Sequence, residues 1–281
     1  MFASAVQWGM ALPRPSPNAT CLITGASSGI GAEIARQLAR RGHGLTLVAR
    51  REQLLVDLAE QLSSTGVRVE VVPADLTDAD ARAALVEQVQ VRGLLVDVLV
   101  NNAGFSTMGP VRLTDRDREL SMVRIDVEAV VDLCTLFVPA MASRRRGAIL
   151  NVASTAGFQP LPGQAGYSAS KAFVLAYTQA LRAELRPLGI AVTALCPGPV
   201  ETGFNEAAGI SDDEAASALP KFLWVPADEV ARAGVEGLEK DRGVVIPGMG
   251  NRVGAMAGHL VPRRLLTPIV AKQHPAMRRS D

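Results

Sequence analysis

Short apolar runs alternate along the chain with longer segments in which apolar residues recur every three or four positions. The short runs are apolar throughout, which is typical of strands buried on both faces of a parallel sheet. They predict strands at Thr20–Thr24, Gly44–Ala49, Val67–Pro73, Val96–Asn101, Ala148–Ala153, Ile190–Cys196 and Gly243–Ile246. The longer segments predict helices, among them Ile30–Arg41, Gln53–Ser63, Ala79–Val91, Asp117–Ser143 and Tyr167–Leu185. We therefore expect an α/β protein with a Rossmann-type, doubly wound parallel sheet flanked by helices on both faces.

The 281 residues contain no composition break, internal repeat or low-complexity linker, so we expect a single Rossmann-fold domain over 19–250. The N-terminal segment 1–18 has no basic start and contains three prolines, which indicates an arm rather than a signal peptide. Residues 251–281 form a C-terminal tail of apolar and basic residues, interrupted by Pro262 and Pro268.

The formal net charge of +1 hides an uneven distribution. The tail holds six basic residues and one acidic residue, a local charge of +5, which leaves −4 for the rest of the chain. The near-neutral overall charge argues against a nucleic-acid partner, and the body is mildly acidic. A basic amphipathic tail is able to dock on an anionic membrane, but we favour packing on its own domain or on a neighbouring subunit. The triplet 144–146, three arginines, is interpreted as a solvated loop.

Cysteine, histidine and hydropathy patterns narrow the protein class further. Cys21, Cys134 and Cys196 each lie inside an apolar run, which predicts buried thiols in a reducing compartment. The three histidines have no ligand-like spacing, so no metal site is expected. No apolar run approaches the roughly 20 residues that span a bilayer. We expect a cytoplasmic protein.

A glycine-rich turn joins the first predicted strand to the first predicted helix. Its glycines permit a tight turn and close approach of the backbone to a pyrophosphate, and the helix N-terminus offers unpaired N–H groups. A tight turn without a ligand is the alternative, which the position after the first strand disfavours. The candidate cofactor contacts are Gly25, Ser27, Ser28, Gly29, Ile30 and Gly31.

Two arginines at the end of the second predicted strand bear on the choice of cofactor. NAD-preferring folds place an acidic residue about 20 positions after the glycines, where it binds the ribose 2′-hydroxyl. Here Arg50 occupies that place and Arg51 follows it. A guanidinium pairs with a 2′-phosphate, whereas a carboxylate repels it. The pair favours NADP(H), the alternative being a solvated start to the next helix.

A serine, a tyrosine and a lysine form the candidate catalytic group. Ser154 ends a predicted strand, and thereby lies at the carboxyl edge of the sheet, where open α/β folds bind ligands. Tyr167 and Lys171 are four residues apart and share one helix face. An ammonium one turn away favours the phenolate form of a tyrosine, so Tyr167 is predicted to act as general acid and base. Ser154 is able to donate a hydrogen bond to the carbonyl oxygen of a substrate.

These motifs, in this order from Thr20 to Thr202, resemble a single-domain short-chain dehydrogenase/reductase of the ketoacyl-reductase-like kind. Segment 24–31 resembles the family's TGxxxGxG turn, 101–104 its NNAG, and 197–202 its PGxxxT. The resemblance implies that Ser154, Tyr167 and Lys171 are the catalytic triad. It also implies cofactor contacts at Asp75, Leu76, Asn102, Ala103, Gly104, Tyr167, Lys171, Pro197, Gly198, Val200 and Thr202.

One position departs from the family pattern. Asp126 stands where family members carry an asparagine that distorts a helix so that a water links the catalytic lysine to solvent. If backbone geometry holds that water, Asp126 is able to replace the asparagine, so we include it among the catalytic candidates. An ionised Asp126 would also keep Lys171 protonated, so we expect activity with an altered pH profile.

The resemblance implies hydride transfer between a nicotinamide and a ketone or secondary alcohol, but it leaves the substrate open. Segment 203–224 matches the family's substrate lid, and its apolar residues favour a ketoacyl or other apolar substrate over an amphipathic surface helix. Steroid-type hydroxy dehydrogenases, a non-catalytic redox sensor and a sugar-nucleotide epimerase are the alternatives, the last disfavoured by the absence of a longer substrate domain. Family members commonly form homodimers or homotetramers through the helices at 117–143 and 167–185.

Overall fold

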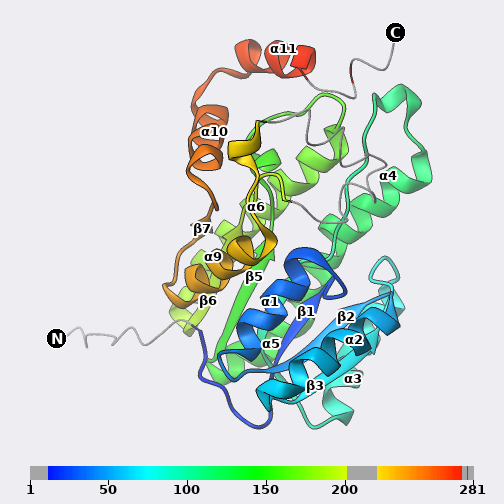
Figure 1. Ribbon diagram of the computed structural model, residues 1–281, viewed down its shortest axis with the longest axis vertical. Helices are drawn as coiled ribbons and strands as arrows, with labels where there is room; N and C mark the ends of the chain where they lie inside the picture. Colours follow the sequence, from blue (N-terminus) through cyan, green and yellow to red (C-terminus); the bar gives the residue numbers. More distant parts are fainter. Residues whose placement is uncertain (1–11, 201–219, 274–276, 278–281) are drawn as a thin grey trace, which may run out of the picture.

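Apolar side chains cover both faces of the central strands, so helices must cover the sheet on both sides. All six residues of β5 (Gly147–Val152) are buried, as are all six of β6 (Ile190–Leu195). The computed structural model, which describes residues 12–200, 220–273 and 277, joins them in a parallel sheet of order β3-β2-β1-β4-β5-β6-β7 (Figure 1). The remaining strands are β1 (Ala19–Thr24), β2 (Gly44–Ala49), β3 (Val69–Pro73), β4 (Leu95–Asn101) and β7 (Val244–Val245).

This sheet confirms the predicted Rossmann-type, doubly wound fold. The seven predicted strands are present, with ends that differ by at most two residues. The strand order reverses between β1 and β4, because the chain runs outward through β2 and β3 before it crosses back. The carboxyl ends of β1 and β4 therefore bound the crevice at which open α/β sheets bind ligands.

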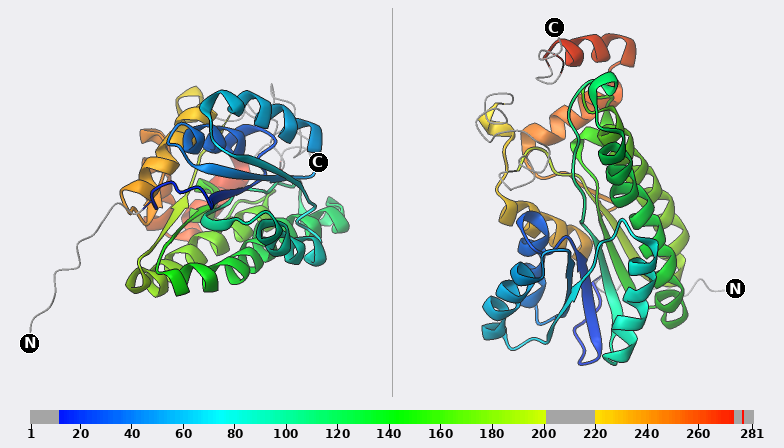
Figure 2. Two further views of the ribbon diagram at one scale, coloured as in Figure 1. Left: turned by 90° about the horizontal axis from the view of Figure 1, so that it is seen from below. Right: turned by 90° about the vertical axis from the view of Figure 1, so that its right-hand side faces the viewer.

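Two layers of helices enclose the sheet, as the left view of Figure 2 shows. Helices α1, α2 and α9 share one apolar core with the strands, while α3, α5 and α6 share the core on the opposite face. The helix bounds are α1 (Gly29–Ala39), α2 (Glu52–Leu62), α3 (Ala79–Val91), α4 (Arg116–Val123), α5 (Ala129–Arg144), α6 (Ala165–Leu185), α9 (Ala227–Glu239), α10 (Met249–Leu260) and α11 (Arg263–Gln273). Helix α9 was not among the predicted helices.

The predicted helix Asp117–Ser143 is interrupted by a π-helical turn, Arg124–Glu128, that separates α4 from α5. Such a turn inserts one extra residue into an α-helix and is frequent at functional sites. Helical periodicity resumes on its far side, so periodicity alone does not reveal it; only the family resemblance at Asp126 implied a distorted helix here. Its middle residue is Asp126, which is fully buried.

The interpretation of residues 144–146 as a solvated loop is wrong. The guanidinium groups of Arg144 and Arg146 lie 3.2 and 2.6 Å from the two carboxylate oxygens of Asp97, whose side chain is buried. Arg145 adopts a left-handed conformation (φ 49°) at the end of α5 and donates a hydrogen bond to the carbonyl oxygen of Pro187. The three arginines therefore join α5 to strand β4 and to the segment before β6.

The two terminal segments are partly packed on the sheet domain. Leu12, from the arm expected at 1–18, is buried in the core that contains α1 and α2. Helix α10 begins at Met249, so the boundary expected between residues 250 and 251 falls inside a helix. Pro262 lies between α10 and α11, whereas Pro268 lies within α11 and does not end it. No helix among the described residues has the length and apolar character needed to cross a membrane.

Candidate active site

The turn after β1 and the turn after β4 are locked together by one threonine. The Thr24 hydroxyl donates to the carbonyl oxygen of Val100 and accepts from the backbone N–H groups of Asn102 (2.9 Å) and Ala103 (3.0 Å). The Asn102 amide in turn donates to the carbonyl oxygens of Thr24 (2.9 Å) and Gly25 (3.2 Å). Thr24 was not a candidate residue, although a hydroxyl that ends an apolar strand was a readable signal.

This close contact explains two of the glycines. A side chain on Gly31 would begin 2.3 Å from the Gly25 carbonyl oxygen and 2.5 Å from the Asn102 amide nitrogen. Gly25 has a φ of +64°, and its missing Cβ would lie 2.8 Å from the backbone of Ala103. The glycines thus let the turn press against the β4 loop, and the backbone stays open on its outer side for a ligand.

The N-terminus of α1 is not capped by its own side chain. Ser28 is the N-cap residue, but its hydroxyl makes no hydrogen bond to the helix. Instead, Arg51 donates from one guanidinium nitrogen to the hydroxyl oxygens of Ser27 (2.9 Å) and Ser28 (2.8 Å). The first-turn N–H groups, which have no partner within the helix, and an adjacent guanidinium form a setting suited to phosphate.

The charge of Arg50 acts on a different neighbour, Asp75. Partial burial would raise the pKa of Asp75, but hydrogen bonds from the Thr77 N–H and hydroxyl, together with the charge of Arg50, lower it. Asp75 and Leu76 follow β3, and Leu76 is buried in the core on the α3 side. The structure therefore brings Arg50 and Arg51 to the same edge of the sheet but gives only Arg51 a contact with the glycine turn.

Ser154 and Tyr167 meet beside the carboxyl end of β5. Ser154 caps the short 3₁₀ turn η4 (Thr155–Phe158), in which its hydroxyl accepts from the Ala156 N–H at 3.1 Å. Tyr167 lies in the first turn of α6 and is buried, and a hydrogen bond joins it to Ser154. The Lys171 ammonium lies one turn further on, 5.7 Å from the centre of the Tyr167 ring.

Lys171 is held by a carbonyl group and a carboxylate. Its ammonium donates to the carbonyl oxygen of Val152 (3.2 Å) and lies 3.4 Å from Oδ2 of Asp126. Oδ1 of Asp126 accepts from the N–H of Phe105 (3.2 Å), whereas Oδ2 has no hydrogen bond among the described residues. The glycine at position 104 leaves room for this carboxylate, because a Cβ there would lie 2.3 Å from Oδ1 of Asp126.

Burial dominates the protonation of these groups. It raises the pKa of Tyr167, and the Lys171 ammonium, which acts in the expected direction, does not reverse the rise. The Asp126 carboxylate adds to this rise, and the hydrogen bond with Ser154 opposes it. Burial also raises the pKa of Asp126 against the charge of Lys171. For Lys171 itself burial lowers the pKa, but the charge and hydrogen bond of Asp126, together with the charges of Tyr167 and Cys196, raise it overall. Lys171 is thus held as a cation and Tyr167 as a phenol.

A buried polar chain beneath the site was not predicted. The Asn101 amide donates to Oδ1 of Asn151 (2.9 Å), whose own amide donates to the hydroxyl of Thr178 (3.0 Å). The chain links β4, β5 and α6, the three elements on which the candidate triad depends. Its signal in the sequence was a polar residue inside each apolar run, which strand patterning alone does not interpret.

The remaining predicted contacts follow β6. The carbonyl oxygen of Pro197 accepts from the N–H of Thr155 (2.8 Å), which brings the segment beside Ser154. Gly198 packs against Asn251 of α10, where a Cβ would lie 2.2 Å from the side-chain oxygen. Val200 packs on the core that contains α1 and α9. Thr202 and most of the expected lid, 203–219, lie outside the described residues.

Comparison with known proteins agrees with this geometry. A family model described as short chain dehydrogenase matches residues 19–212. A protein described as a ketoacyl reductase of the monensin polyketide synthase of Streptomyces virginiae is 42% identical over 194 residues, which cover 66% of this chain and 72% of that protein. The very-long-chain 3-oxoacyl-CoA reductase of Anas platyrhynchos is 34% identical over 218 residues, covering 74% and 69%.

Among solved structures, a short-chain dehydrogenase from Sphingobium yanoikuyae in complex with NADPH is 36% identical, with a TM-score of 0.76. The match covers 89% of this chain and 95% of that one. The chain therefore belongs to the short-chain dehydrogenase family, whose members are oxidoreductases acting on alcohol and carbonyl groups. The particular resemblance to ketoacyl reductases is also confirmed.

Proposed function

We propose that this protein is an NADPH-dependent carbonyl reductase and secondary-alcohol dehydrogenase with Tyr167 as its general acid and base. The observation that carries the proposal is the meeting of Ser154, Tyr167 and Lys171 at the carboxyl edge of the sheet, beside the switch point between β1 and β4. That edge also carries the glycine turn, so a cofactor site and a proton donor share one crevice.

The residues present fit a nicotinamide dinucleotide. The N-terminus of α1 lacks a side-chain cap. Gly25 and Gly31 have no side chains, which allows the close backbone packing of the turn. Arg51 donates hydrogen bonds to the hydroxyls of Ser27 and Ser28. Two adjacent arginines at the end of β2, with no carboxylate at the ribose position, favour the 2′-phosphate of NADP(H). When bound, the reduced cofactor supplies the hydride that forms the new C–H bond.

The chain itself handles the proton. Tyr167 donates its phenolic proton to the carbonyl oxygen of the substrate while hydride arrives at the carbon, and the Ser154 hydroxyl donates a hydrogen bond to the same oxygen. The Lys171 ammonium lies close enough to stabilise the phenolate left behind, which draws a proton back from solvent. In the alcohol-oxidising direction, Tyr167 accepts the proton instead.

Asp126 acts in this scheme as a positioning residue. The π-helical turn aims its side chain at the Phe105 N–H and at Lys171, so that a direct ion pair takes the place of the family's water-linked asparagine. The pair keeps Lys171 charged, and the negative charge of Asp126 at the same time makes the Tyr167 phenol a weaker acid.

We assign ketoacyl or similarly apolar ketones as the substrate class. Part of the described surroundings of Tyr167 is apolar, since Met122, Ala156, Phe105 and Leu161 pack with it. The two relatives named above, a ketoacyl reductase and a long-chain oxoacyl reductase, support the same class. A homodimer or homotetramer paired through α4–α5 and α6 follows from the family pattern.

The test is NADPH oxidation, followed by absorbance, with β-ketoacyl thioesters, aliphatic ketones, steroid ketones and aldehydes as substrates. Tyr167→Phe is expected to lower kcat by about 100- to 10,000-fold, because the proton donor is lost. The matched control is Tyr177→Phe on the same helix, whose hydroxyl bonds to Cys134 in the core, away from the triad. This control is expected to retain turnover.

Either of two results would contradict the proposal. Turnover unaffected by Tyr167→Phe would remove the proton-transfer role of the tyrosine. Binding of NADPH without turnover of any carbonyl would favour the redox-sensor alternative.

A further inference from the structure

Helix α10 packs on the domain through one face and carries exposed apolar side chains on its outer face. On the packed face Asn251 and Ala255 are buried, and the Asn251 amide donates to the carbonyl oxygens of Leu223 (2.9 Å) and Pro247 (3.1 Å). The outer face carries a stripe of side chains that are 61–74% exposed: Met249, Val253, Met256 and Leu260. Spacings of four, three and four residues place this stripe on one side of a helix, opposite the packed side.

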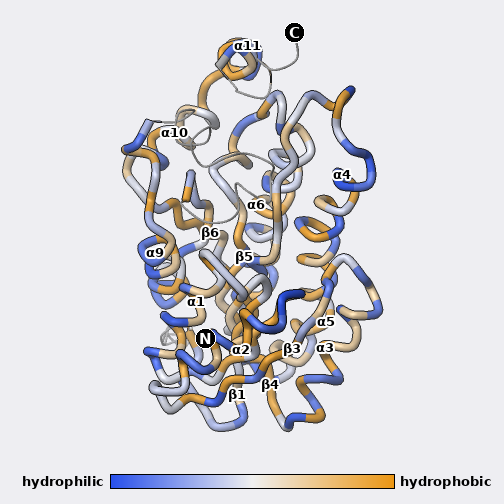
Figure 3. Tube along the Cα trace, turned by 45° about the vertical axis from the view of Figure 1, so that its right-hand side comes forward, coloured by the Kyte–Doolittle hydropathy of each residue, from blue (hydrophilic) through white to orange (hydrophobic). Residues whose placement is uncertain are grey.

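Helix α11 extends the apolar character and adds charge. Leu265 and Ile269, one turn apart, are 57% and 56% exposed. Figure 3 shows hydrophobic and hydrophilic positions side by side in this helix, and Figure 1 shows it as the outermost helix at one end of the molecule. We call the following set the basic apolar face: Met249, Val253, Met256, Leu260, Leu265 and Ile269, with the exposed cations Arg252, Arg263, Arg264 and Lys272.

The charge of this face is one-sided. Residues 249–273 contain no aspartate or glutamate, while the chain before residue 251 carries a net charge of −4. A second copy in symmetric contact would place the same four cations against each other with no carboxylate from either helix to offset them. An anionic lipid surface supplies the opposite charge, together with an acyl layer for the aliphatic and methionine side chains.

We propose that the basic apolar face docks this protein peripherally on an anionic lipid bilayer. The apolar stripe enters the boundary between headgroups and acyl chains, and the arginines and Lys272 remain among the headgroups. The contact is peripheral, because no described helix is long and apolar enough to cross a bilayer.

The location of the face gives the docking a functional consequence. Helix α10 packs on the segment that follows Ser154, since a Cβ on Gly258 would lie 3.0 Å from Oε1 of Gln159. Docking through α10 and α11 therefore holds the active-site end of the sheet toward the lipid. The docking itself does not depend on the proposed reaction, and its test uses no turnover.

The experiment is vesicle flotation of the full-length protein. Vesicles of phosphatidylcholine alone are compared with vesicles of phosphatidylcholine mixed with phosphatidylglycerol, at low and high salt. Wild type is expected to float with the anionic vesicles at low salt and to be released by high salt. A charge variant, R263E/R264E/K272E, is expected to lose at least about fivefold in partitioning for each cation removed. An apolar variant, V253S/M256S/L260S, is expected to lose anionic-vesicle binding as well.

Matched controls change exposed residues elsewhere. Arg116→Glu on α4 reverses one cation whose side chain is 82% exposed, and Val91→Ser on α3 removes a 72% exposed apolar side chain. Both are expected to float as wild type does, and circular dichroism checks that every variant is folded. Absence of flotation by wild type, or flotation unchanged by the charge and apolar variants, overturns the proposal. So does an apolar variant that changes only the oligomeric state in light scattering, since this assigns the face to a second copy.

Discussion

Asp126 tolerates complete burial because one carboxylate oxygen faces a backbone N–H donor and the other faces a cation. Oδ1 accepts from the Phe105 N–H, and Oδ2 lies at ion-pair distance from Lys171. A buried carboxylate without such a partner would be neutral or strongly destabilising. The neighbouring Gly104 is part of the same solution, because any side chain there would collide with Oδ1. The carboxylate, the lysine and the glycine therefore function as one unit.

We predict that Asp126→Asn shifts the pH dependence of carbonyl reduction to lower pH. The charge of Asp126 raises the pKa of Tyr167, so its removal lowers that pKa. Reduction requires the protonated phenol and is lost as pH rises through the Tyr167 pKa. The alkaline limb of kcat/KM is therefore expected to move to lower pH. The measurement is kcat/KM against pH for wild type and variant with one ketone substrate.

The control for this prediction is Asp117→Asn, which removes an exposed carboxylate of α4 and is expected to leave the profile in place. Coincident profiles for Asp126→Asn and wild type would show that Asp126 and Tyr167 are not coupled. A loss of activity equal at every pH would point to a structural role for Asp126 only.

At the scale of single residues, the sequence predicted which side chains meet but not how they are held. Ser154 and Tyr167 were found because a strand end and a helix face have fixed directions. The contact of Arg51, rather than Arg50, with Ser27 and Ser28 depends on how the start of α2 lies against the glycine turn. Sequence spacing does not encode that tertiary detail.

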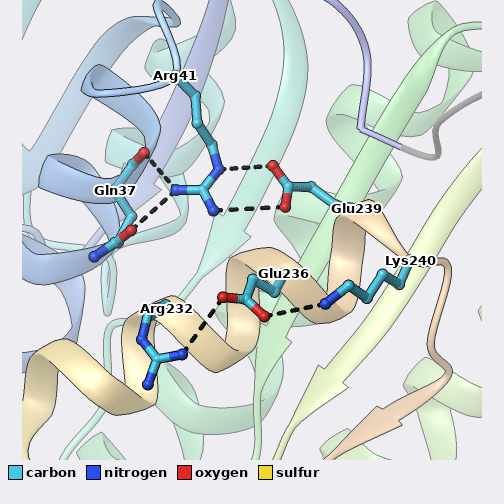
Figure 4. Close-up of polar contacts among 6 residues, drawn as sticks. All are labelled: Gln37, Arg41, Arg232, Glu236, Glu239 and Lys240. Atoms are coloured by element: carbon cyan, nitrogen blue, oxygen red, sulfur yellow. Dashed lines mark hydrogen bonds and ion pairs between the residues drawn. The ribbon is translucent and has the colours of Figure 1, made fainter.

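Helix α9 is attached to α1 by a two-pronged ion pair across the layer that covers one face of the sheet (Figure 4). Arg41 donates from Nε to one oxygen of Glu239 at 2.6 Å and from Nη2 to the other at 3.5 Å. Its third nitrogen donates to the backbone and side-chain oxygens of Gln37 (3.0 and 2.9 Å). Both charged side chains are only about one quarter exposed. The contact therefore fixes the end of α9 to the end of α1.

We expect Arg41→Ala to lower the free energy of unfolding by about 1–2 kcal/mol, because it breaks several charge-assisted bonds and leaves Glu239 unpaired. The comparison is Arg232→Ala on the same helix α9, which loses one exposed pair with Glu236 at 3.5 Å. That change is expected to cost less than about 0.5 kcal/mol. Urea unfolding measures both, and equal losses would show that the α1–α9 contact is no stronger than a surface pair.

At the scale of elements, strand positions were predictable and the helix between 117 and 143 was only partly so. Central strands such as β2 and β5 are almost entirely apolar, with one polar residue each, and such short runs favour buried strands. A π-helical turn adds one residue and then restores the helical period, so periodicity did not reveal it. The resemblance at Asp126 implied a distorted helix, and the structure shows the distortion as a π-helical turn at Arg124–Glu128. The ion pairs of Arg144 and Arg146 with Asp97 were also not predictable, because the three residues are far apart in the sequence and meet only in the folded chain.

The whole molecule is organised around the switch point of its sheet. Strands β1, β2 and β3 lie on one side of this point, and β4 to β7 lie on the other. The glycine turn belongs to the first group and the candidate triad to the second, so a cofactor in the crevice would contact both. Thr24 and Asn102 already bond the two groups together without it. We therefore propose that the sheet and its helices form one folding unit, whose bounds extend beyond the expected 19–250 to include Leu12 and α10.

We therefore predict that NADPH raises the melting temperature of the protein in a single, undivided transition. At a concentration about 100 times Kd, binding adds about 2.7 kcal/mol to the free energy of unfolding, a shift of roughly 5–10 °C for a domain of this size. Differential scanning calorimetry measures the shift with NADPH and with NADH. Arg50→Asp is expected to reduce the NADPH shift and to spare the NADH shift, because Arg50 stands at the ribose position. Arg51→Asp also removes the bonds to Ser27 and Ser28 of the glycine turn, so it is expected to reduce both shifts. An unchanged preference in both variants would contradict the assignment of NADP(H).

Two transitions, of which only one moves with NADPH, would show that the two halves of the sheet unfold separately. Since the Thr24 and Asn102 bonds join those halves in the cofactor-free protein, we expect the transition to be single before NADPH is added as well.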